Sequence, residues 1–416
     1  MEYRVTGGAR LEGELCVRGA KNAALPLLAA SVLTNGTTVL TNCPRITDVE
    51  VSLEILAACG CGASFSEHSA AIETRGLCSG DIPKDLAEKM RSSFIFLGAL
   101  LGRTGAARTS CPGGCAIGER PVDLHLDGLR RLGAEITIDG GVISAKARKL
   151  RGARIDLAFP SVGATENLML ASVLAEGETV IVNAAKEPEI ADLQNFLNVC
   201  GAKIKGAGSG QIVIRGVPRL YGAEYSVMPD RVAAGTYLAA AAITGGSVIL
   251  HNIEREHIQP ITARFSECGA GVLFKGESLK MCAPRPLKPI ERLVTGVHPE
   301  FPTDMQPQMT ALLTKARGRS AIVETVFEAR DKHVAELVKM GADISIKNGA
   351  FLIKGGGRLR GEDVSASDLR GGAALIIAAL SAEGVTTVRN AGYVTRGYEA
   401  IEEDLKGLGA GIELTL

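Results

Sequence analysis

Apolar and polar residues alternate in several short segments, each of which follows a Gly-Ala pair. Residues 134–145 (AEITIDGGVISA), 202–216 and 342–355 place apolar side chains at every second position on both sides of a turn. This alternation predicts a hairpin of two half-buried strands. The glycine before it is expected to end a helix, so each segment predicts a helix end followed by a hairpin.

The Gly-Ala pair recurs along the whole chain with a nearly constant period. Its glycines are separated by 71, 68, 68, 72 and 68 residues. A constant period indicates repeated supersecondary units, here about two helices and four strands each. The six pairs are Gly62-Ala63, Gly133-Ala134, Gly201-Ala202, Gly269-Ala270, Gly341-Ala342 and Gly409-Ala410.

Each repeat also contains a segment that is apolar on all sides. Residues 22–33, 233–246 and 371–384 are rich in Ala, Leu and Ile and carry almost no charge. Helices of this kind are buried, and runs of about 12 residues are too short to span a bilayer. We therefore expect an α/β protein of inside-out architecture, in which buried helices are surrounded by sheets.

The chain starts in the middle of a repeat. Residues 2–43 hold the later half of a unit whose Gly-Ala half lies at the carboxyl end, so the first strand should pair within the last unit. This offset predicts two domains of three repeats each. We expect a middle domain over 22–229, carrying the Cys115 segment, and a discontinuous domain made of 1–21 and 230–416.

Composition narrows the possible functions. The chain has 46 basic and 46 acidic residues, no Trp and 4% aromatic residues, which argues against nucleic acid as a partner. The amino terminus shows no apolar signal segment, and we expect a cytoplasmic protein without membrane insertion. Most of the ten cysteines should then be unpaired packing residues. Cys59 and Cys61 lack the second pair that zinc needs, so we expect neither a metal nor a cofactor.

The segment from Cys111 to His125 (CPGGCAIGERPVDLH) has the composition of a reactive loop. Proline and two glycines exclude a helix and present Cys115 close to Arg120, Asp123 and His125. The alternative is that Cys115 is a small buried apolar residue, as cysteine often is. The loop alone does not decide between the two.

A second group of polar residues precedes the predicted inner helices, where helix N–H groups are available to anions. Cations from both domains could there hold a phosphate or a carboxylate. For any single residue the alternative is an ordinary surface or capping role. These residues are Lys21 with Asn22, Arg91, Ser161 to Gly163, Asp230 with Arg231, Asp304, and Asp368 with Arg370.

Five motifs resemble those of one family over the full length of the chain. They are GAKNAALP at 19–26, PGGCAIGERPVDLH at 112–125, SVGATEN at 161–167, FPTDMQ at 301–306 and DLR at 368–370. Their order and spacing are similar to those of the UDP-N-acetylglucosamine enolpyruvyl transferases. The resemblance implies an inside-out fold of two three-unit domains. It implies transfer of the enolpyruvyl group of phosphoenolpyruvate to the sugar 3′-hydroxyl, the first committed step of peptidoglycan precursor synthesis.

The same resemblance implies roles for individual residues. Lys21, Arg120 and Arg396 would hold the phosphate of phosphoenolpyruvate, with Asn22 beside them, and Arg330 and Arg370 would lie near its carboxylate. His125 would support the loop. The residues implied for UDP-N-acetylglucosamine are Asn22, Arg91, Arg120, Pro121, Val122, Asp123, Leu124, Ser161, Val162, Gly163, Asp304 and the main chain at Val326.

The implied chemistry needs one acid and one base. By resemblance, Cys115 protonates C3 of phosphoenolpyruvate, can form a covalent adduct at C2 and is the target of fosfomycin, while Asp304 is the base. Asp368 is the alternative base. Two positions depart from the family pattern: Phe159 stands where some members have lysine, and Ala329 replaces asparagine.

Two other functions stay open. The related enzyme that uses shikimate 3-phosphate has a serine-rich segment after its amino-terminal lysine and no cysteine loop, unlike this chain. A catalytically silent paralogue would bind the sugar nucleotide without turnover. Lys21, Cys115, Asp304 and Arg396 argue against the silent paralogue.

Overall fold

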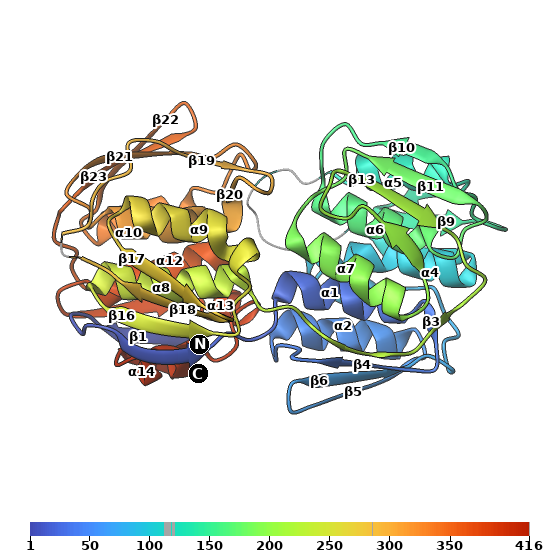
Figure 1. Ribbon diagram of the computed structural model, residues 1–416, viewed down its shortest axis with the longest axis horizontal. Coiled ribbons are helices and arrows are strands. Elements are labelled where there is room, and N and C mark those ends of the chain that lie inside the picture. Colours follow the sequence, from blue (N-terminus) through green and yellow to red (C-terminus); the bar gives the residue numbers. More distant parts are fainter. Residues whose placement is uncertain (112–117, 119–120, 285, 416) are drawn as a thin grey trace. The chain divides into compact units, whose positions relative to one another are not determined.

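A computed structural model describes residues 1–111, 118, 121–284 and 286–415. The chain forms two compact units (Figure 1). The terminal unit contains residues 1–18 and 229–415, and the middle unit contains residues 19–111 and 121–228. Each unit has its own hydrophobic core.

The middle unit holds three repeats of two main helices and a sheet. Its elements are α1 (Lys21–Ser31), β3 (Thr34–Asn35), β4 (Thr37–Thr41), α2 (Thr47–Ala58), β5 (Gly62–Ser66), β6 (Ser69–Glu73), α3 (Lys84–Ala87), the 3-10 helix η1 (Arg91–Ile95), α4 (Phe96–Thr104), β7 (Ala106–Ser110), α5 (Asp123–Arg131), β8 (Glu135–Asp139), β9 (Val142–Lys146), β10 (Arg154–Asp156), α6 (Val162–Ser172), β11 (Glu178–Val182), α7 (Pro188–Val199), β12 (Lys203–Lys205), β13 (Gln211–Arg215), β14 (Leu220–Tyr221) and β15 (Glu224–Ser226).

The terminal unit repeats the same plan. Its elements are β1 (Glu2–Thr6), β2 (Glu12–Cys16), α8 (Arg231–Thr244), β16 (Ser247–His251), α9 (Arg255–Glu267), β17 (Gly271–Lys275), β18 (Ser278–Cys282), β19 (Leu293–Gly296), β20 (Phe301–Pro302), the 3-10 helix η2 (Thr303–Met305), α10 (Gln306–Leu313), β21 (Gly318–Val323), α11 (Lys332–Lys339), β22 (Asp343–Lys347), β23 (Ala350–Gly355), β24 (Asp363–Ser365), α12 (Leu369–Leu380), β25 (Val385–Arg389), α13 (Gly392–Thr395), α14 (Ile401–Gly407) and β26 (Gly411–Thr415).

The apolar helices are interior, as the sequence predicts. Every residue of α10 and α12 is buried, and so is almost all of α8. Strands lie outside these inner helices, whereas the second helix of a repeat, such as α9 with four buried residues of thirteen, lies nearer the surface (Figure 1). The inside-out α/β architecture is therefore confirmed. Among the described residues, no helix is long and apolar enough to cross a membrane.

The sheets show how the repeat is offset along the chain. In the sheet of order β24-β25-β1-β26, strand β1 pairs antiparallel with both β25 and β26. The predicted pairing of the first strand with the last repeat is thus confirmed. Other described strands also pair beyond their own repeat: β2 precedes α1 but pairs with β16, and β14 and β15 precede α8 but pair with β3 and β4.

Glycine ends one helix in each repeat by the same hydrogen bonds. At Gly133, for example, φ is 93°, its N–H donates to the carbonyl of Arg130, and the Ala134 N–H donates to the carbonyl of Leu129. This is the left-handed helix end for which glycine is preferred. In the first repeat the residues in this position are Gly60 and Cys61, because Gly62 already begins β5. The assignment of Gly62-Ala63 to the helix end is therefore wrong by two residues.

Candidate functional site

The structure places the predicted polar residues at helix starts. Lys21 is the first residue of α1, Arg91 the first of η1, and Asp304 lies in η2 directly before α10. Three others precede the first helical residue: Ser161 before α6, Asp230 before α8 and Asp368 before α12.

Capping explains part of this group. Asp368 Oδ1 accepts hydrogen bonds from the N–H groups of Arg370 and Gly371, at 3.0 and 2.9 Å. Asp230 Oδ1 accepts from Val232 and Ala233, both at 2.8 Å. A carboxylate at this position satisfies backbone donors that the helix leaves open. Asp230 and Asp368 thus have a local structural role, whatever ligand their helix starts bind.

The terminal unit brings three predicted site residues together around one carboxylate. Asp304 Oδ1 accepts a hydrogen bond from Arg330 Nη1 at 3.0 Å. Asp304 Oδ2 accepts from Arg370 Nε at 3.2 Å and from Arg370 Nη2 at 3.0 Å. We call Asp304, Arg330 and Arg370 the carboxylate cluster.

The members of the carboxylate cluster differ in their access to solvent. Arg330 and Arg370 side chains are only 5% and 3% exposed, whereas Asp304 is 25% exposed. Burial by itself raises the pKa of Asp304, but attraction to Arg370 and Arg330 outweighs it and holds that pKa well below its usual range. Asp304 is therefore a firmly ionised carboxylate and, in this arrangement, a weak base.

Residues that the sequence did not single out hold the two arginines in place. Arg330 Nη1 also donates to Thr303 Oγ1 at 2.8 Å, and its guanidinium lies 4.7 Å from the centre of the Phe327 ring. Arg370 lies 5.3 Å from the ring centre of Tyr398. Thr303 stands inside the FPTDMQ motif, but nothing in the sequence pattern marks Phe327 or Tyr398.

Glu324 organises the segment that contains Val326. Its Oε1 accepts hydrogen bonds from the N–H groups of Val326 and Phe327, at 2.8 and 3.2 Å, and its Oε2 accepts one from Thr303 Oγ1 at 2.9 Å. The Val326 N–H is therefore used within the protein, which leaves the carbonyl as its main-chain group for a ligand. Glu324 carries no sequence signal either.

Both arginines retain buried donor capacity. Within the described chain, Arg330 Nε and Arg370 Nη1 are buried and have no hydrogen-bond partner. A buried N–H without a partner is costly, and two of them beside one carboxylate are donors that a ligand acceptor could satisfy. His333, on α11, is also buried and has no hydrogen-bond partner within the described residues.

In the middle unit, two cations are held at helix starts. Lys21 Nζ lies 2.8 Å from Asp48 Oδ2, and both side chains are largely covered. Arg91 Nη2 donates to the carbonyl oxygen of Pro121 at 3.2 Å, next to the segment that leads into α5. The remaining predicted ligand residues of this segment follow directly: Val122 precedes α5, and Asp123 and Leu124 begin it.

His125 lies in a neutral hydrogen-bond network with Asn167. Asn167 Nδ2 lies 3.0 Å from His125 Nδ1 and 3.1 Å from the carbonyl oxygen of Phe94, while its Oδ1 accepts from the Gly98 N–H at 2.6 Å. Because the amide nitrogen is the donor to both acceptors, His125 Nδ1 accepts and Nε2 carries the proton. The His125 ring also packs against Gly163, where a Cβ would lie 3.2 Å from Cε1.

Burial keeps this histidine uncharged. Burial, helped by the nearby charge of Arg91, lowers the pKa of His125 from 6.5 to about 3. The predicted supporting role of His125 thus has a partner that the sequence analysis missed. Asn167 is the last residue of the SVGATEN motif, and the sequence pattern indicates no role for its side chain.

Several predicted residues are not part of these contacts. Cys115 and Arg120 lie outside the described residues. Asn22 is the second residue of α1, and Arg396 directly follows α13. Phe159 is 47% exposed, so the position that departs from the family pattern is at the surface.

Cysteine and metal chemistry do not extend the site within the described chain. Among the described cysteines, Cys43, Cys59, Cys61, Cys200 and Cys268 are buried. Burial raises the pKa of Cys59 to about 12, which makes it an inert packing residue. The described residues contain no group of three or more His, Cys, Asp or Glu that could hold a metal ion.

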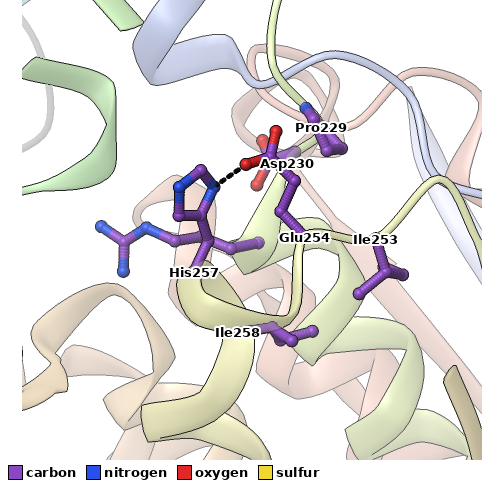
Figure 2. Close-up of a pocket in the computed structure, with 7 residues that line it drawn as sticks. Pro229, Asp230, Ile253, Glu254, His257 and Ile258 are labelled. Carbon is purple, nitrogen blue, oxygen red and sulfur yellow. Dashed lines mark ion pairs between the residues drawn. The ribbon is translucent and has the colours of Figure 1, made fainter. Parts of the chain in front are cut away.

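A separate pocket lies at the start of α9 in the terminal unit. Figure 2 shows His257 directed toward Glu254, with His257 Nδ1 and Glu254 Oε2 3.1 Å apart. None of the family-implied ligand residues lines it. The lining residues are Pro229, Asp230, Arg231, Ile253, Glu254, His257 and Ile258.

Comparison with known proteins identifies the family. A family model described as EPSP synthase (3-phosphoshikimate 1-carboxyvinyltransferase) matches residues 5–405. A UDP-N-acetylglucosamine 1-carboxyvinyltransferase 2 from Carboxydothermus hydrogenoformans is 50% identical over 414 residues, covering 99% of both chains. The chain belongs to the enolpyruvate transferases, among the UDP-N-acetylglucosamine 1-carboxyvinyltransferases.

Other relatives agree with this family. The UDP-N-acetylglucosamine 1-carboxyvinyltransferase 2 of Caldanaerobacter subterraneus subsp. tengcongensis is 48% identical over 412 residues, with 99% of each chain covered. Among solved structures, the enolpyruvyl transferase NikO from Streptomyces tendae has a TM-score of 0.90 and 25% identity, covering 99% of this chain and 98% of that one. An EPSP synthase from Acinetobacter baumannii, at 21% identity and a TM-score of 0.77 over all of both chains, shares the fold.

Proposed function

We propose that this chain transfers the enolpyruvyl group of phosphoenolpyruvate to the 3′-hydroxyl of UDP-N-acetylglucosamine and releases phosphate. It is a transferase, and the reaction is the first step of peptidoglycan precursor synthesis. The observation that carries this function is the 48–50% identity to UDP-N-acetylglucosamine 1-carboxyvinyltransferases over nearly the whole chain. The solved EPSP synthases from Acinetobacter baumannii are only 20–21% identical to this chain.

The carboxylate cluster supports the assignment of one substrate subsite. Arg330 and Arg370 already bind a carboxylate, that of Asp304, through three hydrogen bonds. A guanidinium pair of this kind fits the carboxylate of phosphoenolpyruvate. Lys21, Arg120 and Arg396 are proposed for its phosphate, with Asn22 beside them.

The remaining residues are proposed for the sugar nucleotide. Arg91, Asn22, Asp304 and the Val326 main chain would hold the amino sugar and its diphosphate. The uridine end would lie against the starts of α5 and α6, where His125 packs on Gly163. The residues proposed at that end are Arg120, Pro121, Val122, Asp123, Leu124, Ser161, Val162 and Gly163.

The proposed chemistry is addition followed by elimination. Cys115 would donate a proton to C3 of phosphoenolpyruvate while the sugar hydroxyl, losing its proton to Asp304, attacks C2. Loss of a proton from C3 and of phosphate from C2 then gives the enol ether. Attack of the Cys115 sulfur on C2 would instead give a covalent adduct.

Substitution of Cys115 separates its two proposed roles. Cys115→Asp should stay active and resist the epoxide fosfomycin, because a carboxylic acid can donate a proton but is a poor target for alkylation. Cys115→Ser should lose most of its turnover at neutral pH, because a hydroxyl is a far weaker acid. A serine variant as active as the parent would contradict Cys115 as the acid.

Phosphate release tests the reaction itself. We expect release from phosphoenolpyruvate to depend on UDP-N-acetylglucosamine and not to be supported by shikimate 3-phosphate. Phosphate release that does not depend on the sugar nucleotide would rule out the proposed function. We further propose a cytoplasmic protein that supplies cell wall synthesis, and through it cell shape and division.

A further inference from the structure

Asp304 lies where a ligand carboxylate would be expected to bind. Its two oxygens accept three hydrogen bonds from Arg330 and Arg370. In the reaction proposed above, phosphoenolpyruvate brings a carboxylate with the same geometry and charge. A protein carboxylate and a substrate carboxylate that need the same donors compete for them.

We propose, on the basis of that function, that phosphoenolpyruvate displaces Asp304 from Arg330 and Arg370, so that the substrate itself releases the catalytic base. Asp304 would then act first as a stand-in for the substrate carboxylate and afterwards as the acceptor of the sugar hydroxyl proton.

The three side chains differ in their freedom to move, and this favours displacement of Asp304. The arginine side chains are 5% and 3% exposed and are fixed against Phe327 and Tyr398. Asp304 is 25% exposed and lies in a 3-10 helix of three residues. An arriving anion therefore meets two fixed cations and one partner that can leave.

The two arginines have more hydrogen-bond donors than Asp304 uses. Arg330 Nε and Arg370 Nη1 are buried donors without an acceptor in the described part of the chain. Two guanidinium charges face the single charge of Asp304, so the cluster keeps a net positive charge. A substrate carboxylate that takes the place of Asp304 would therefore meet both an attractive charge and further donors.

Displacement would change the basicity of Asp304 in a defined direction. Burial raises its pKa, while Arg370 and Arg330 lower it further than burial raises it. Once a substrate carboxylate binds both arginines, their attraction for Asp304 is weakened, while the effect of burial remains. Each unit by which the pKa rises makes Asp304 a tenfold stronger proton acceptor.

Neighbouring charged groups do not substitute for Asp304. Asp368 is nearby but accepts hydrogen bonds from the N–H groups of Arg370 and Gly371 as a helix cap. Asp230 caps α8 in the same way, and its charge also acts on Arg370. Burial lowers the pKa of His333 to about 4, while the charge of Asp368 raises that pKa and the charge of Arg330 lowers it. His333 is therefore neutral at pH 7.

Binding of phosphoenolpyruvate alone, followed by isothermal titration calorimetry, tests the competition. Asp304→Asn keeps the shape of the side chain but no longer competes as an anion, so we expect binding at least about tenfold tighter than in the parent. Asp368→Asn is the matched control: the same change close to the same arginine, at a carboxylate held by backbone donors, should not tighten binding tenfold. Equal or weaker binding by Asp304→Asn would overturn the proposal.

A spectroscopic measurement separates displacement from a general effect of charge. In the parent protein carrying ¹³C-labelled aspartate, saturating phosphoenolpyruvate should shift one carboxyl resonance, and Asp304→Asn should lack that resonance. Its midpoint in a pH titration should lie higher with phosphoenolpyruvate than without it. An unchanged resonance in a protein that still turns over with the sugar nucleotide would overturn the displacement alone. Absence of both binding and turnover would overturn the proposed function as well.

Discussion

The carboxylate cluster and the His125–Asn167 network sit at comparable places but handle charge in opposite ways. Both involve residues at or near helix starts, His125 in α5 and Asp304 directly before α10. Both are largely buried, although Asp304 is 25% exposed. His125 is kept neutral by burial, and Asn167 satisfies its Nδ1. Asp304, Arg330 and Arg370 keep all their charges and neutralise one another in part.

This difference shows which site can respond to an anion. In the neutral network the nitrogen and the oxygen of the Asn167 amide both have internal partners, so an anion gains nothing by rearranging that amide. In the carboxylate cluster an incoming anion could replace one carboxylate by another, and the two arginines that would bind it are already buried. The network in the middle unit is therefore suited to fix geometry, and the cluster in the terminal unit is suited to exchange partners.

The largest effect is expected from removing the charge of Asp304. Asp304→Asn should lower kcat by roughly 10²–10⁴-fold, the usual contribution of a general base, while the fold is retained. Steady-state phosphate release measures the loss, and circular dichroism checks the fold. If the asparagine variant kept most of its activity, the base would lie elsewhere, and Asp368 would be the first alternative.

Asn167 should matter for stability more than most polar residues. Asn167→Leu has a similar volume but leaves the Gly98 N–H and the Phe94 carbonyl without their partner, at a cost of about 3 kcal/mol in the free energy of unfolding. Urea unfolding measures it. The matched control is Asn198→Leu, an exposed asparagine with two hydrogen bonds to Ile204, where water can replace the side chain. An equal loss of unfolding free energy in both variants would contradict a special role of Asn167.

Acid should destabilise the neutral network. The folded chain holds the pKa of His125 near 3, whereas the unfolded chain protonates it below about 6.5. The stability that this shift provides is complete above pH 6.5 and is lost as the pH falls toward 3. Between pH 6 and 4 the slope from this residue should approach about 1.4 kcal/mol per pH unit. His125→Gln should flatten the measured slope by that amount, and an unchanged slope would contradict a neutral His125.

The smallest effects concern the caps of the two sites. Ser161 Oγ accepts a hydrogen bond from the Ala164 N–H at 3.3 Å, so Ser161→Ala should cost about 1 kcal/mol in thermal or urea unfolding. Asp368→Asn should cost less, because asparagine caps a helix about as well as aspartate does. A larger loss for Asp368→Asn would mean that its charge, and not only its cap, stabilises the Arg370 region.

The fold was largely predictable because it repeats. Six copies of one pattern gave the inner helices, the hairpins and the pairing of β1 with the last repeat. The error at Gly62 arose where a second glycine, Gly60, stands two residues earlier and a Cys occupies the usual position of Ala. The sequence pattern alone does not show which of two glycines, two residues apart, ends the helix.

The candidate site was predictable residue by residue but not contact by contact. Asp304, Arg330 and Arg370 could be named, yet their mutual binding depends on folding that joins positions 26 and 66 residues apart. Glu324 and Tyr398 escaped notice because an isolated Glu or Tyr carries no pattern. Contacts of this kind arise from tertiary packing, for which a single sequence has no local signal.

The strand pairings also set an order for synthesis on the ribosome. Once residue 228 has emerged, every described strand of the middle unit is available, including β15 for its pairing with β4. Strand β2 waits until β16 ends at His251, and strand β1 waits much longer, because β25 and β26 end at Arg389 and Thr415. The first eighteen residues therefore stay without their partners through most of translation, and they are the part of the nascent chain that a chaperone would meet longest.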